Sequence, residues 1–526
     1  MPRQRQPLDF AGSGPEEAEL IAFLFDPVSY PEPAEPIERI ETHAARVFLV
    51  GRKAYKIKKR IKLPFLDFST LTSRKQALER EFELNREHAP ELYLGVTAIS
   101  RTPDGSFSFG EGEIVDYALV MNRFDQEELL ARISARGPLP TTVARELADM
   151  VARYHRAVPI AAGTSGADLM RDTIAGLAAG MTDAAPASAV DVMKEFARRS
   201  LAEVVLLGPL LEARGVAGHV RRCHGDLHLG NIVLRDGRAV PFDALEFDER
   251  LACIDVFYDL AFLLMDLDVR GDRAAANIVL NTYVTTEPTG GEIEGLATLP
   301  LFLATRAAVR ALVALESALQ KPEGQDADDV DRARSYANAA NTYLSPQAPM
   351  LVAVGGLSGT GKSTLAASLA SRIGPAPGAL VLRTDVERKK LFDVPESFHL
   401  TVEHYAEQAS DEVYAVLYDK THRALAAGHA VIFDGVSAKA AERDRIEEIA
   451  RNLGIAFAGL WLEAPLETQI ARVEARRGDA SDSNEAVVRA QAERDVGEVH
   501  WFRIDAGKTP EHALSLALEA LGLPRS

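Results

Sequence analysis

The 526-residue sequence predicts a two-lobed α+β domain followed by an α/β domain with a parallel sheet. Two observations carry this prediction. Over the first 344 residues, short strand patterns precede long helical patterns, which is typical of an α+β domain. From residue 350 onward, strands rich in Val, Leu and Ile alternate regularly with helices, which is typical of a parallel sheet covered on both faces.

In the first domain, the expected strands lie around Gly51 within 46–60, and at 114–121, 232–234 and 239–242. The expected helices lie at 73–88, 141–157, 187–214, 252–268 and 326–344. The motif SPQAP at 345–349 then places two prolines between the last helix and the apolar run MLVAV. We therefore predict a first domain at 1–344, a linker at 345–349 and a second domain at 350–526.

In the second domain, strands are expected at 350–355, 379–384, 430–434 and 457–462. Helices are expected between and after them, at 363–373, 403–427, 438–453 and 466–476. The strands' carboxyl ends meet at one edge of such a sheet, and ligands of open α/β sheets bind at that edge. We therefore look for a site at the residues that follow these strands.

Composition indicates a cytoplasmic protein that binds neither nucleic acid nor membrane. The 77 acidic and 59 basic residues give a net charge of −18, which repels a phosphate backbone. The most apolar long segment, 296–319, carries Arg306, Arg310 and Glu316, and the first residues lack a hydrophobic signal region. The two cysteines are too few for a disulfide framework and indicate a reducing compartment.

The stretch HGDLHLGN places Asp226 and Asn231 in one loop, and FDALEF places Asp243 twelve residues further on, after two short strands. Phosphoryl transfer from ATP needs a carboxylate near the acceptor hydroxyl and oxygen ligands that hold Mg²⁺ on the phosphates. This spacing predicts Asp226 as the base and Asn231 and Asp243 as metal ligands. The alternative is that Asp226 is an ordinary turn or capping residue, but the joint pattern is much rarer than HGD alone.

Such a site also needs a lysine for the nucleotide phosphates and a helical glutamate that holds the lysine. In the strand AYKIKK, Lys56 and Lys58 lie on one face, and either could serve. Glu81 and Glu83 point about 200° apart on the helix, so only one of them can face the lysine. We favour Lys56 with Glu81; the alternative for each is a solvated surface charge.

These motifs, together with IDVFYDLAFLLMDL at 254–267, resemble the aminoglycoside phosphotransferase family over about residues 40–340. The resemblance implies a kinase-like fold, ATP, Mg²⁺ and transfer to a hydroxyl of a small molecule. The sequence departs from protein kinases in two ways. No GxGxxG loop occurs near 46–56, and DAL at 243–245 replaces DFG, so the phosphate-covering loop is not identified.

The segment GLSGTGKST follows an expected strand and opens an expected helix, as a phosphate-binding loop requires. Its backbone amides would wrap the phosphates, Lys362 would reach the β and γ phosphates, and the Ser363 hydroxyl would bind Mg²⁺. The predicted nucleotide-binding residues of this loop are Gly356, Ser358, Gly359, Thr360, Gly361, Lys362, Ser363 and Thr364.

Two later carboxylates complete this second site. Asp434 ends the strand AVIF and fits the metal-ordering carboxylate, while Asp385 follows the strand LVLR and fits a base for the acceptor. The alternative for Asp385 is an N-cap of the next helix. Arg472 and Arg476 share a helix face before the polar segment 478–486. We expect this segment to form a lid and these two arginines to neutralise the transferred phosphoryl group. The alternative is a solvated basic helix face.

Over about 350–510, the sequence resembles small P-loop kinases of the gluconate-kinase and zeta-toxin type, through GLSGTGKST, TDVER, VIFDG and RVEARR. The resemblance implies transfer to a hydroxyl of a sugar, nucleotide sugar or nucleoside. The sequence therefore predicts an ATP-dependent phosphotransferase with two nucleotide sites and small hydroxylated substrates. The alternative is a regulatory protein in which one domain senses nucleotide. Polynucleotide kinase activity is disfavoured by the acidity of the chain.

Overall fold

The computed structural model describes residues 15–32, 34, 36–42, 44–63, 66–184, 187–286, 292–319, 327–475 and 480–524. The chain forms two compact units. The first comprises Met1–Gly137, Val158–Ala161 and Arg221–Ile254, and the second comprises Pro138–Ala157, Ala162–Val220 and Asp255–Ser526. The predicted division at 345–349 stays a prediction; helix α12 ends at Tyr343 and strand β13 begins at Met350.

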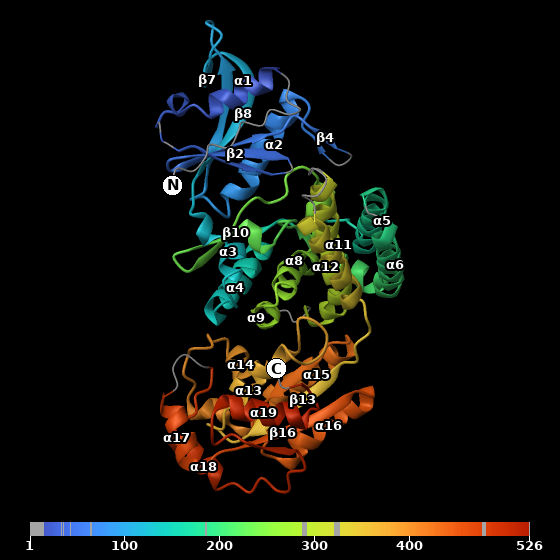
Figure 1. Ribbon diagram of the computed structural model, residues 1–526. Coiled ribbons are helices and arrows are strands. Elements are labelled where there is room, and N and C mark those ends of the chain that lie inside the picture. The colour runs from blue at the N-terminus through green and yellow to red at the C-terminus, as the bar shows by residue number, and fades with distance from the viewer. Residues whose placement is uncertain are drawn as a thin grey trace. The chain divides into compact units, whose positions relative to one another are not determined.

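The first unit contains a six-stranded antiparallel sheet in the order β1-β2-β3-β8-β6-β7. Its strands are β1 Glu38–Glu41, β2 Ala45–Val50, β3 Lys53–Lys58, β6 Tyr93–Arg101, β7 Phe107–Phe109 and β8 Glu113–Asn122. Helix α2, Leu71–Arg86, contacts β6 and β8 (Figure 1). The sequence predicted β2, β3, β8 and α2, but not β1, β6 or β7.

Side-chain alternation along the strands explains why both faces of this sheet are covered. On one face, Leu49 and Leu119 pack with Leu78 of α2. On the other face, Phe48 and Ile57 pack with residues of α1, Pro15–Leu24.

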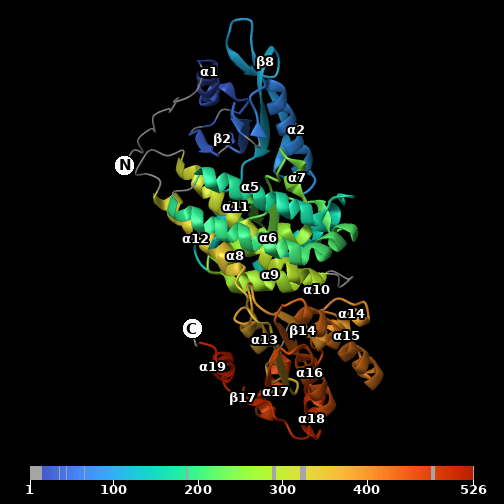
Figure 2. The same ribbon diagram turned by 90° about the vertical axis from the view of Figure 1, so that its right-hand side faces the viewer.

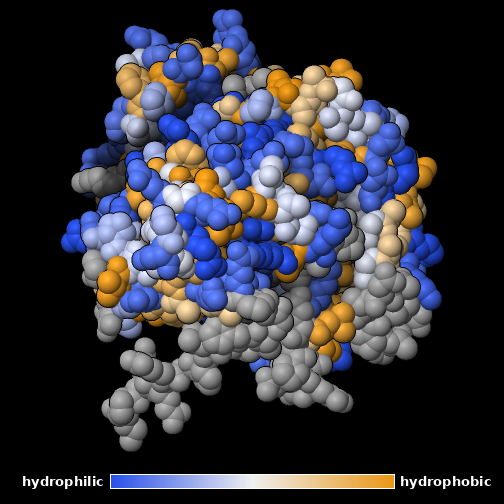
Figure 3. Space-filling view, turned by 90° about the horizontal axis from the view of Figure 1, so that it is seen from above, coloured by the Kyte–Doolittle hydropathy of each residue, from blue (hydrophilic) through white to orange (hydrophobic). Residues whose placement is uncertain are grey.

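Figure 3 shows mainly hydrophilic residues on the viewed surface, with hydrophobic residues scattered among them, as on an ordinary exposed face.

A β-hairpin in the same unit lies between the HGD loop, which carries Asp226 and Asn231, and Asp243. The short helix η3, Leu229–Asn231, leads into β10, Ile232–Arg235, which pairs antiparallel with β11, Arg238–Pro241. The sequence predicted both strands. Because the hairpin returns the chain to its starting point, it brings Asp243 back beside the loop that carries Asp226 and Asn231.

The second unit begins with a group of helices. These are α4 Thr141–Ala157, α5 Gly166–Ala184, α6 Ala187–Val216, α8 Val256–Val269, α9 Arg273–Thr286, α11 Leu299–Leu319 and α12 Ala327–Tyr343. The helix predicted at 252–268 begins at Val256, because the Asp255 side chain caps it by accepting from the Phe257 N–H. Helices α11 and α12 pack against each other (Figure 2).

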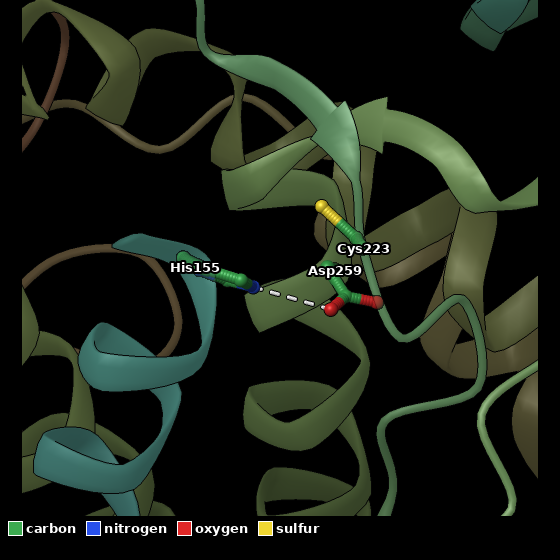
Figure 4. Close-up of side chains that lie close together, drawn as sticks. All are labelled: His155, Cys223 and Asp259. Atoms are coloured by element: carbon green, nitrogen blue, oxygen red, sulfur yellow. Dashed lines mark hydrogen bonds and ion pairs between the residues drawn. The ribbon is translucent and has the colours of Figure 1, made fainter. Parts of the chain in front are cut away.

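Three buried polar side chains of these helices contact one another. His155 Nε2 lies 3.1 Å from Asp259 Oδ2 (Figure 4), and His155 Nδ1 lies 2.9 Å from the Tyr283 hydroxyl.

Among the described residues, one helical stretch, Glu292–Leu319, meets the length and hydropathy requirements of a membrane-spanning segment, and 67% of its most apolar window is buried within the structure.

The second unit also contains a five-stranded parallel sheet in the order β14-β15-β13-β16-β17. Its strands are β13 Met350–Gly356, β14 Leu380–Arg383, β15 Val431–Asp434, β16 Ala456–Glu463 and β17 Phe502–Asp505. Its helices are α13 Lys362–Ala370, α14 Thr384–Leu391, α15 Glu407–Ala426, α16 Ala440–Leu453, α17 Leu466–Ala475, α18 Glu485–Ala492 and α19 Pro510–Ala520. The predicted fold class, α+β followed by α/β with a parallel sheet, is confirmed.

Three details of this domain differ from the prediction. Helix α13 ends three residues earlier than expected, at Ala370, and α15 begins at Glu407, after a short 3-10 helix. The sequence did not identify α14, α18, β17 or α19. The register places the last residue of β14, Arg383, opposite Asp434, the last residue of β15. The strand ends therefore meet at one edge of the sheet, next to Gly356 of β13.

His429, in the connection between α15 and β15, should make the stability of this domain sensitive to acid. Burial lowers the pKa of His429 from 6.5 to about 4. Between these two values the unfolded chain binds a proton that the folded domain excludes, so stability present above pH 6.5 is lost as the pH falls toward 4. We expect the free energy of unfolding to fall by about 2 kcal/mol between pH 7 and pH 5 through this group.

The measurement is urea unfolding followed by tryptophan fluorescence. Both tryptophans of the chain, Trp461 and Trp501, lie in or next to this sheet, so the signal reports this domain. His429→Gln should remove the stated part of the pH dependence, whereas His422→Gln, at an exposed histidine of α15, should keep it. The same pH dependence in wild type and His429→Gln would contradict the assignment.

Candidate active sites

In the first unit, the predicted lysine and glutamate form an ion pair. Lys56 Nζ of β3 lies 2.7 Å from Glu81 Oε1 of α2 and 2.6 Å from Asp243 Oδ1. Lys58, the alternative lysine, is bound in the same way: its Nζ lies 2.7 Å from Glu81 Oε2 and 2.6 Å from Glu246 Oε1. Glu81 therefore holds both lysines at once. Glu83 pairs instead with Arg80 on the exposed face of α2.

The ionisation of this cluster follows from burial and charge together. Burial by itself would raise the pKa of Asp243, but the ammonium groups of Lys56 and Lys58 outweigh it and hold the pKa below its ordinary value. Burial would lower the pKa of Lys56, but Asp243 and Glu81 raise it well above the ordinary value. Lys56 and Asp243 are therefore ionised near neutral pH.

Asp243 has a backbone conformation that few residues other than glycine adopt, with φ of +62°. Two side chains hold it. The Asp243 N–H donates to the Tyr93 hydroxyl at 2.9 Å, and the Ala244 N–H donates to Asn85 Oδ1 at 2.9 Å. Asn85 also donates to the Glu81 carbonyl at 2.8 Å, so α2 fixes both the glutamate and the Asp243 segment.

The HGD loop brings Asp226 and Asn231 together. Asn231 Nδ2 donates to the Asp226 carbonyl at 2.9 Å and to Asp226 Oδ2 at 2.8 Å, which leaves Asn231 Oδ1 as its oxygen donor for a metal. The Asp226 N–H donates to His224 Nδ1 at 3.3 Å, so His224 Nε2 carries the proton that it donates to the Phe242 carbonyl at 3.0 Å. His224 is fully buried and supports the loop, while the Asp226 side chain is 40% exposed.

The donor atoms in this first site suit a hard divalent cation. Asn231 Oδ1 and the Asp243 carboxylate are oxygen donors of the type that Mg²⁺ prefers. Asp226 and Asp243 are near enough for the charge of Asp226 to raise the pKa of Asp243. The Asp243 side chain is 37% exposed, so it is open to a ligand from solvent.

In the second unit, the predicted phosphate loop lines a cavity of about 1240 Å³. Gly356, Gly359 and Gly361 have positive φ values of 138°, 82° and 95°. At Gly359 a side chain is excluded, since a Cβ atom would lie 2.5 Å from the Gln469 carbonyl oxygen. Gly361 is the N-cap of α13, and Lys362 Nζ donates to the Leu357 carbonyl at 3.0 Å. Residues Ser358, Gly359, Thr360, Gly361, Lys362, Ser363 and Thr364 all line the cavity.

Asp434 and Ser363 lie together at the edge of the sheet, where the sequence predicted a metal. Burial raises the pKa of Asp434, and Arg383, Lys362 and a hydrogen bond from Ser363 oppose this effect. Arg383 Nε lies 3.3 Å from Asp434 Oδ2, and Arg383 donates to Ser363 Oγ at 3.2 Å. The hydroxyl and the carboxylate are suitable oxygen ligands for Mg²⁺. Arg383 is a charged neighbour that the sequence analysis missed.

Asp385 also lines the cavity, in the first turn of α14. The N-cap of α14 is Arg383, so the capping alternative for Asp385 is wrong. Nearby, the buried Arg388 donates to the His404 carbonyl at 2.9 Å, and its guanidinium lies 4.6 Å from the centre of the Tyr405 ring. Asp385 therefore faces the cavity beside a fixed guanidinium and an aromatic ring.

Asp482, a carboxylate that the sequence did not predict, lines the same cavity. Asp482 accepts hydrogen bonds from Tyr405 at 2.8 Å and from the Leu400 N–H at 3.2 Å, and it pairs with the buried Lys389. Burial would raise its pKa, but these hydrogen bonds hold the pKa below the ordinary value. Asp482 lies within the expected lid, 478–486, and thus joins this segment to the 398–405 segment.

The structure describes only one of the two arginines that were predicted to act with the lid. Arg472, on α17, lines the cavity and donates to the Thr360 carbonyl at 3.3 Å and to the Lys508 carbonyl at 2.9 Å. It is therefore fixed against the phosphate loop and is not a solvated surface residue. Arg476 lies outside the described residues.

Two residues of the segment that contains α18 bind the phosphate loop directly. The Ser358 N–H donates to Gln491 Oε1 at 2.8 Å, and Ser483 Oγ donates to Ser358 Oγ at 2.9 Å. Both residues line the cavity. Backbone N–H groups of this loop are the expected phosphate ligands. The hydrogen bond to Gln491 Oε1 therefore engages the Ser358 N–H, one of the groups expected to bind phosphate.

Gln491→Leu should therefore strengthen nucleotide binding at the second site. The substitution frees the Ser358 N–H from its internal acceptor, which is worth about 1 kcal/mol, or roughly fivefold in affinity. Calorimetric titration of Mg²⁺ and ADP into the full chain, carrying Lys56→Met to disable the first site, measures the effect. Gln408→Leu, at an exposed glutamine of α15 outside the cavity, is the matched control. Weaker binding by Gln491→Leu would instead assign Gln491 to the ligand contacts.

Two family models match separate parts of the chain, and each part contains residues of one of the two candidate sites. The sequence model of the Phosphotransferase enzyme family matches residues 74–296, and that of an AAA domain matches residues 351–495. An uncharacterized protein of Mycobacterium tuberculosis is 30% identical over 505 residues, which cover 93% of this chain and 96% of the relative.

Two solved structures are similar to separate parts of the chain. A choline/ethanolamine kinase family protein from Mesorhizobium loti has 17% identity and a TM-score of 0.37, with 61% of this chain and 93% of that chain covered. A gluconokinase from Sinorhizobium meliloti has 20% identity and a TM-score of 0.25, with 33% of this chain and 91% of that chain covered.

The match to the mycobacterial protein extends through both domains and nearly the whole of each chain. The two family models fall on the two halves that contain the sites described above. The chain therefore belongs to the family of this mycobacterial protein, and in this chain an aminoglycoside phosphotransferase-like kinase domain is followed by a P-loop kinase domain.

Proposed function

We propose that the protein is an ATP-dependent phosphotransferase with two nucleotide sites, each of which transfers the γ-phosphate to a hydroxyl of a small molecule. The observation that carries the proposal is the repetition of one set of groups in two unrelated folds. Each site combines a lysine, oxygen donors suited to Mg²⁺, and a further carboxylate that can act as a base.

At the first site, Lys56 would bind the nucleotide phosphates, and Asn231 and Asp243 would hold Mg²⁺. The ion, when bound, would neutralise charge on the phosphates. Asp226 would accept the proton of the acceptor hydroxyl, and its hydrogen bond from Asn231 Nδ2 would hold the carboxylate in place. The Tyr93 and Asn85 contacts would keep the Asp243 segment in its strained conformation while ligands exchange.

At the second site, Lys362 and the backbone amides of residues 358–364 would bind the phosphates, and Ser363 and Asp434 would hold Mg²⁺. Arg383 would have to leave Ser363 or Asp434 before the metal binds, since it contacts both. Asp385 would accept the acceptor's proton, and Arg472 would face the nucleotide from α17. The acceptors proposed are small hydroxylated metabolites in the cytoplasm; the net charge of −18 disfavours nucleic acid.

The experiment is a screen of hydroxylated metabolites with radiolabelled ATP, using the full chain and two variants that each disable one site. Asp226→Asn should abolish labelling of one group of acceptors, and Asp385→Asn should abolish labelling of another. Both variants should still bind nucleotide. If no metabolite is labelled although both sites bind nucleotide, the phosphotransferase proposal fails for small-molecule acceptors.

The alternative is a regulatory protein in which the second domain senses nucleotide without transferring phosphate. The contact of Gln491 with the Ser358 N–H favours it, because nucleotide would displace this contact and release α18. In that case Asp385→Asn would leave all transfer activity unchanged, and only the first site would label an acceptor.

A further inference from the structure

Five ionisable side chains form an alternating chain of charges in the first unit. In order they are Asp243, Lys56, Glu81, Lys58 and Glu246, and each neighbouring pair is 2.6 or 2.7 Å apart. Exposure decreases from one end toward the middle. The side chain of Asp243 is 37% exposed, that of Lys56 is 10% exposed and that of Glu81 is fully buried. A ligand from solvent therefore reaches this chain at the Asp243 end.

The proposed function uses only the open end of this chain. Lys56 would bind the phosphates while Glu81 holds it, and Asp243 would bind the metal, so Lys56 would share its charge between Glu81 and the nucleotide. Lys58 and Glu246 have no part in that reaction, although both are buried. Lys58 Nζ also lies 5.3 Å from the centre of the Phe68 ring, so this lysine is enclosed on a further side.

We propose that Lys58 is a positioning residue of the first nucleotide site, which holds Glu81 in place while Lys56 binds nucleotide and which fixes the Asp243 segment through Glu246. The inference rests on the proposed function of this site. Lys58 acts through other residues and does not touch the nucleotide.

The first part of the inference follows from the cost of an unpaired buried charge. Glu81 is fully buried, and a buried carboxylate that loses its counter-ion is strongly destabilised. With Lys58 at 2.7 Å, Glu81 keeps a second cation when Lys56 shares its charge with the phosphates. Without Lys58, Glu81 would compete with the nucleotide for Lys56, and nucleotide binding would weaken.

The second part follows from the position of Glu246, three residues after Asp243. The segment between them is held at Asp243 by Tyr93, at Ala244 by Asn85, and at Leu245 by the His224 carbonyl, which accepts from the Leu245 N–H at 2.9 Å. The ion pair of Glu246 with Lys58 adds a fixed point on β3. Lys56, which is proposed to bind phosphate, and Asp243, which is proposed to bind the metal, are thereby both connected to β3.

The test is calorimetric binding of a non-hydrolysable ATP analogue with Mg²⁺ to the full chain carrying Lys362→Met, which disables the second site. In this protein, Lys58→Met should weaken binding on the order of tenfold, as the loss of a buried counter-ion predicts. Lys58→Arg keeps the charge and should stay within about twofold of the parent. The matched control is Lys59→Met, at the adjacent lysine that pairs with the half-exposed Glu41 at 3.0 Å, and it should have no effect.

A double-mutant cycle separates positioning from a general effect on folding. In a Glu81→Gln background, Lys58→Met should weaken binding by clearly less than about tenfold, because the route through Glu81 is already lost and only the contact of Lys58 with Glu246 remains. An equal loss in both backgrounds, or no loss in either, would overturn the inference. If the Lys362→Met protein itself binds no analogue, the proposed first nucleotide site is wrong, and the Lys58 inference fails with it. If the Lys362→Met protein binds the analogue but Lys58→Met has no effect, only the Lys58 inference fails.

A second variant covers the case in which Lys58→Met does not fold. Glu246→Gln leaves the Lys58 contact with Glu81 and removes only the charge that fixes the Asp243 segment. We expect a higher Mg²⁺ concentration for half-maximal analogue binding, by roughly threefold to tenfold. An unchanged Mg²⁺ requirement in Glu246→Gln would overturn the inference.

Discussion

Asp226→Asn is expected to lower phosphoryl transfer at the first site by about 10²- to 10⁴-fold, the usual contribution of a general base. The amide cannot accept the acceptor's proton but has nearly the same shape as the carboxylate. Nucleotide binding should change little, because the proposed phosphate and metal groups, Lys56, Asn231 and Asp243, are all retained. The measurement is radiolabel transfer to an acceptor found in the screen, in the Lys362→Met protein so that only the first site contributes.

Asp236→Asn is the matched control for this prediction. Asp236 lies in the exposed turn of the β10–β11 hairpin, ten residues after Asp226, and has a φ of +49°, which asparagine also adopts readily. Its substitution should leave transfer unchanged. If Asp226→Asn retains full transfer while the control behaves as expected, Asp226 is a structural residue of the HGD loop and not the base.

Lys362→Met is expected to weaken nucleotide binding at the second site by about 3 kcal/mol, or roughly 100-fold. The ammonium is the only group of the phosphate loop, residues 356–364, that carries a full positive charge. Charge-assisted hydrogen bonds to phosphate are stronger than the backbone contacts that would remain. Calorimetry with ADP and Mg²⁺ on the full chain, with Lys56→Met to disable the first site, measures the loss.

Lys420→Met is the matched control for the phosphate loop. Lys420 lies on α15, pairs with Glu387 at 2.6 Å and does not line the cavity, so its substitution should leave binding unchanged. Equal affinity in Lys362→Met and its parent would show that nucleotide does not bind at this loop. The proposal of a second nucleotide site would then be withdrawn, while the first site would be unaffected.

Short-range patterns predicted the parts of both sites that lie close together in the sequence. The loop from Gly356 to Thr364 could be predicted because its glycines, lysine and hydroxyl groups lie within nine residues of one another. The HGD loop and Asp243 could be predicted for the same reason, since only a short hairpin separates them. In each case the chemistry depends on backbone geometry that local sequence determines.

Residues that meet through pairing of distant segments were not predicted. Tyr93 contacts Asp243 across 150 positions of sequence, and Gln491 contacts Ser358 across 133. Neither lies in a motif, and an isolated Tyr or Gln has no periodic or compositional mark. The strand β6, which carries Tyr93, was itself missed, because its half-buried residues do not alternate clearly between polar and apolar.

The choice between Lys56 and Lys58 shows where sequence information ends. Strand alternation placed both lysines on one face, and helix geometry allowed only one of Glu81 and Glu83 to face them, but neither could say which lysine meets the glutamate. The tertiary structure shows that Glu81 binds both, because α2 packs over β6 and β8 and presents one carboxylate, with two oxygens, to β3. The amino-acid sequence was sufficient to predict the fold classes and the local motifs of the two candidate sites. Only the packing of α2 and of the Asp243 segment decided how the charges pair, because ion pairing depends on distances between segments that the chain order does not encode.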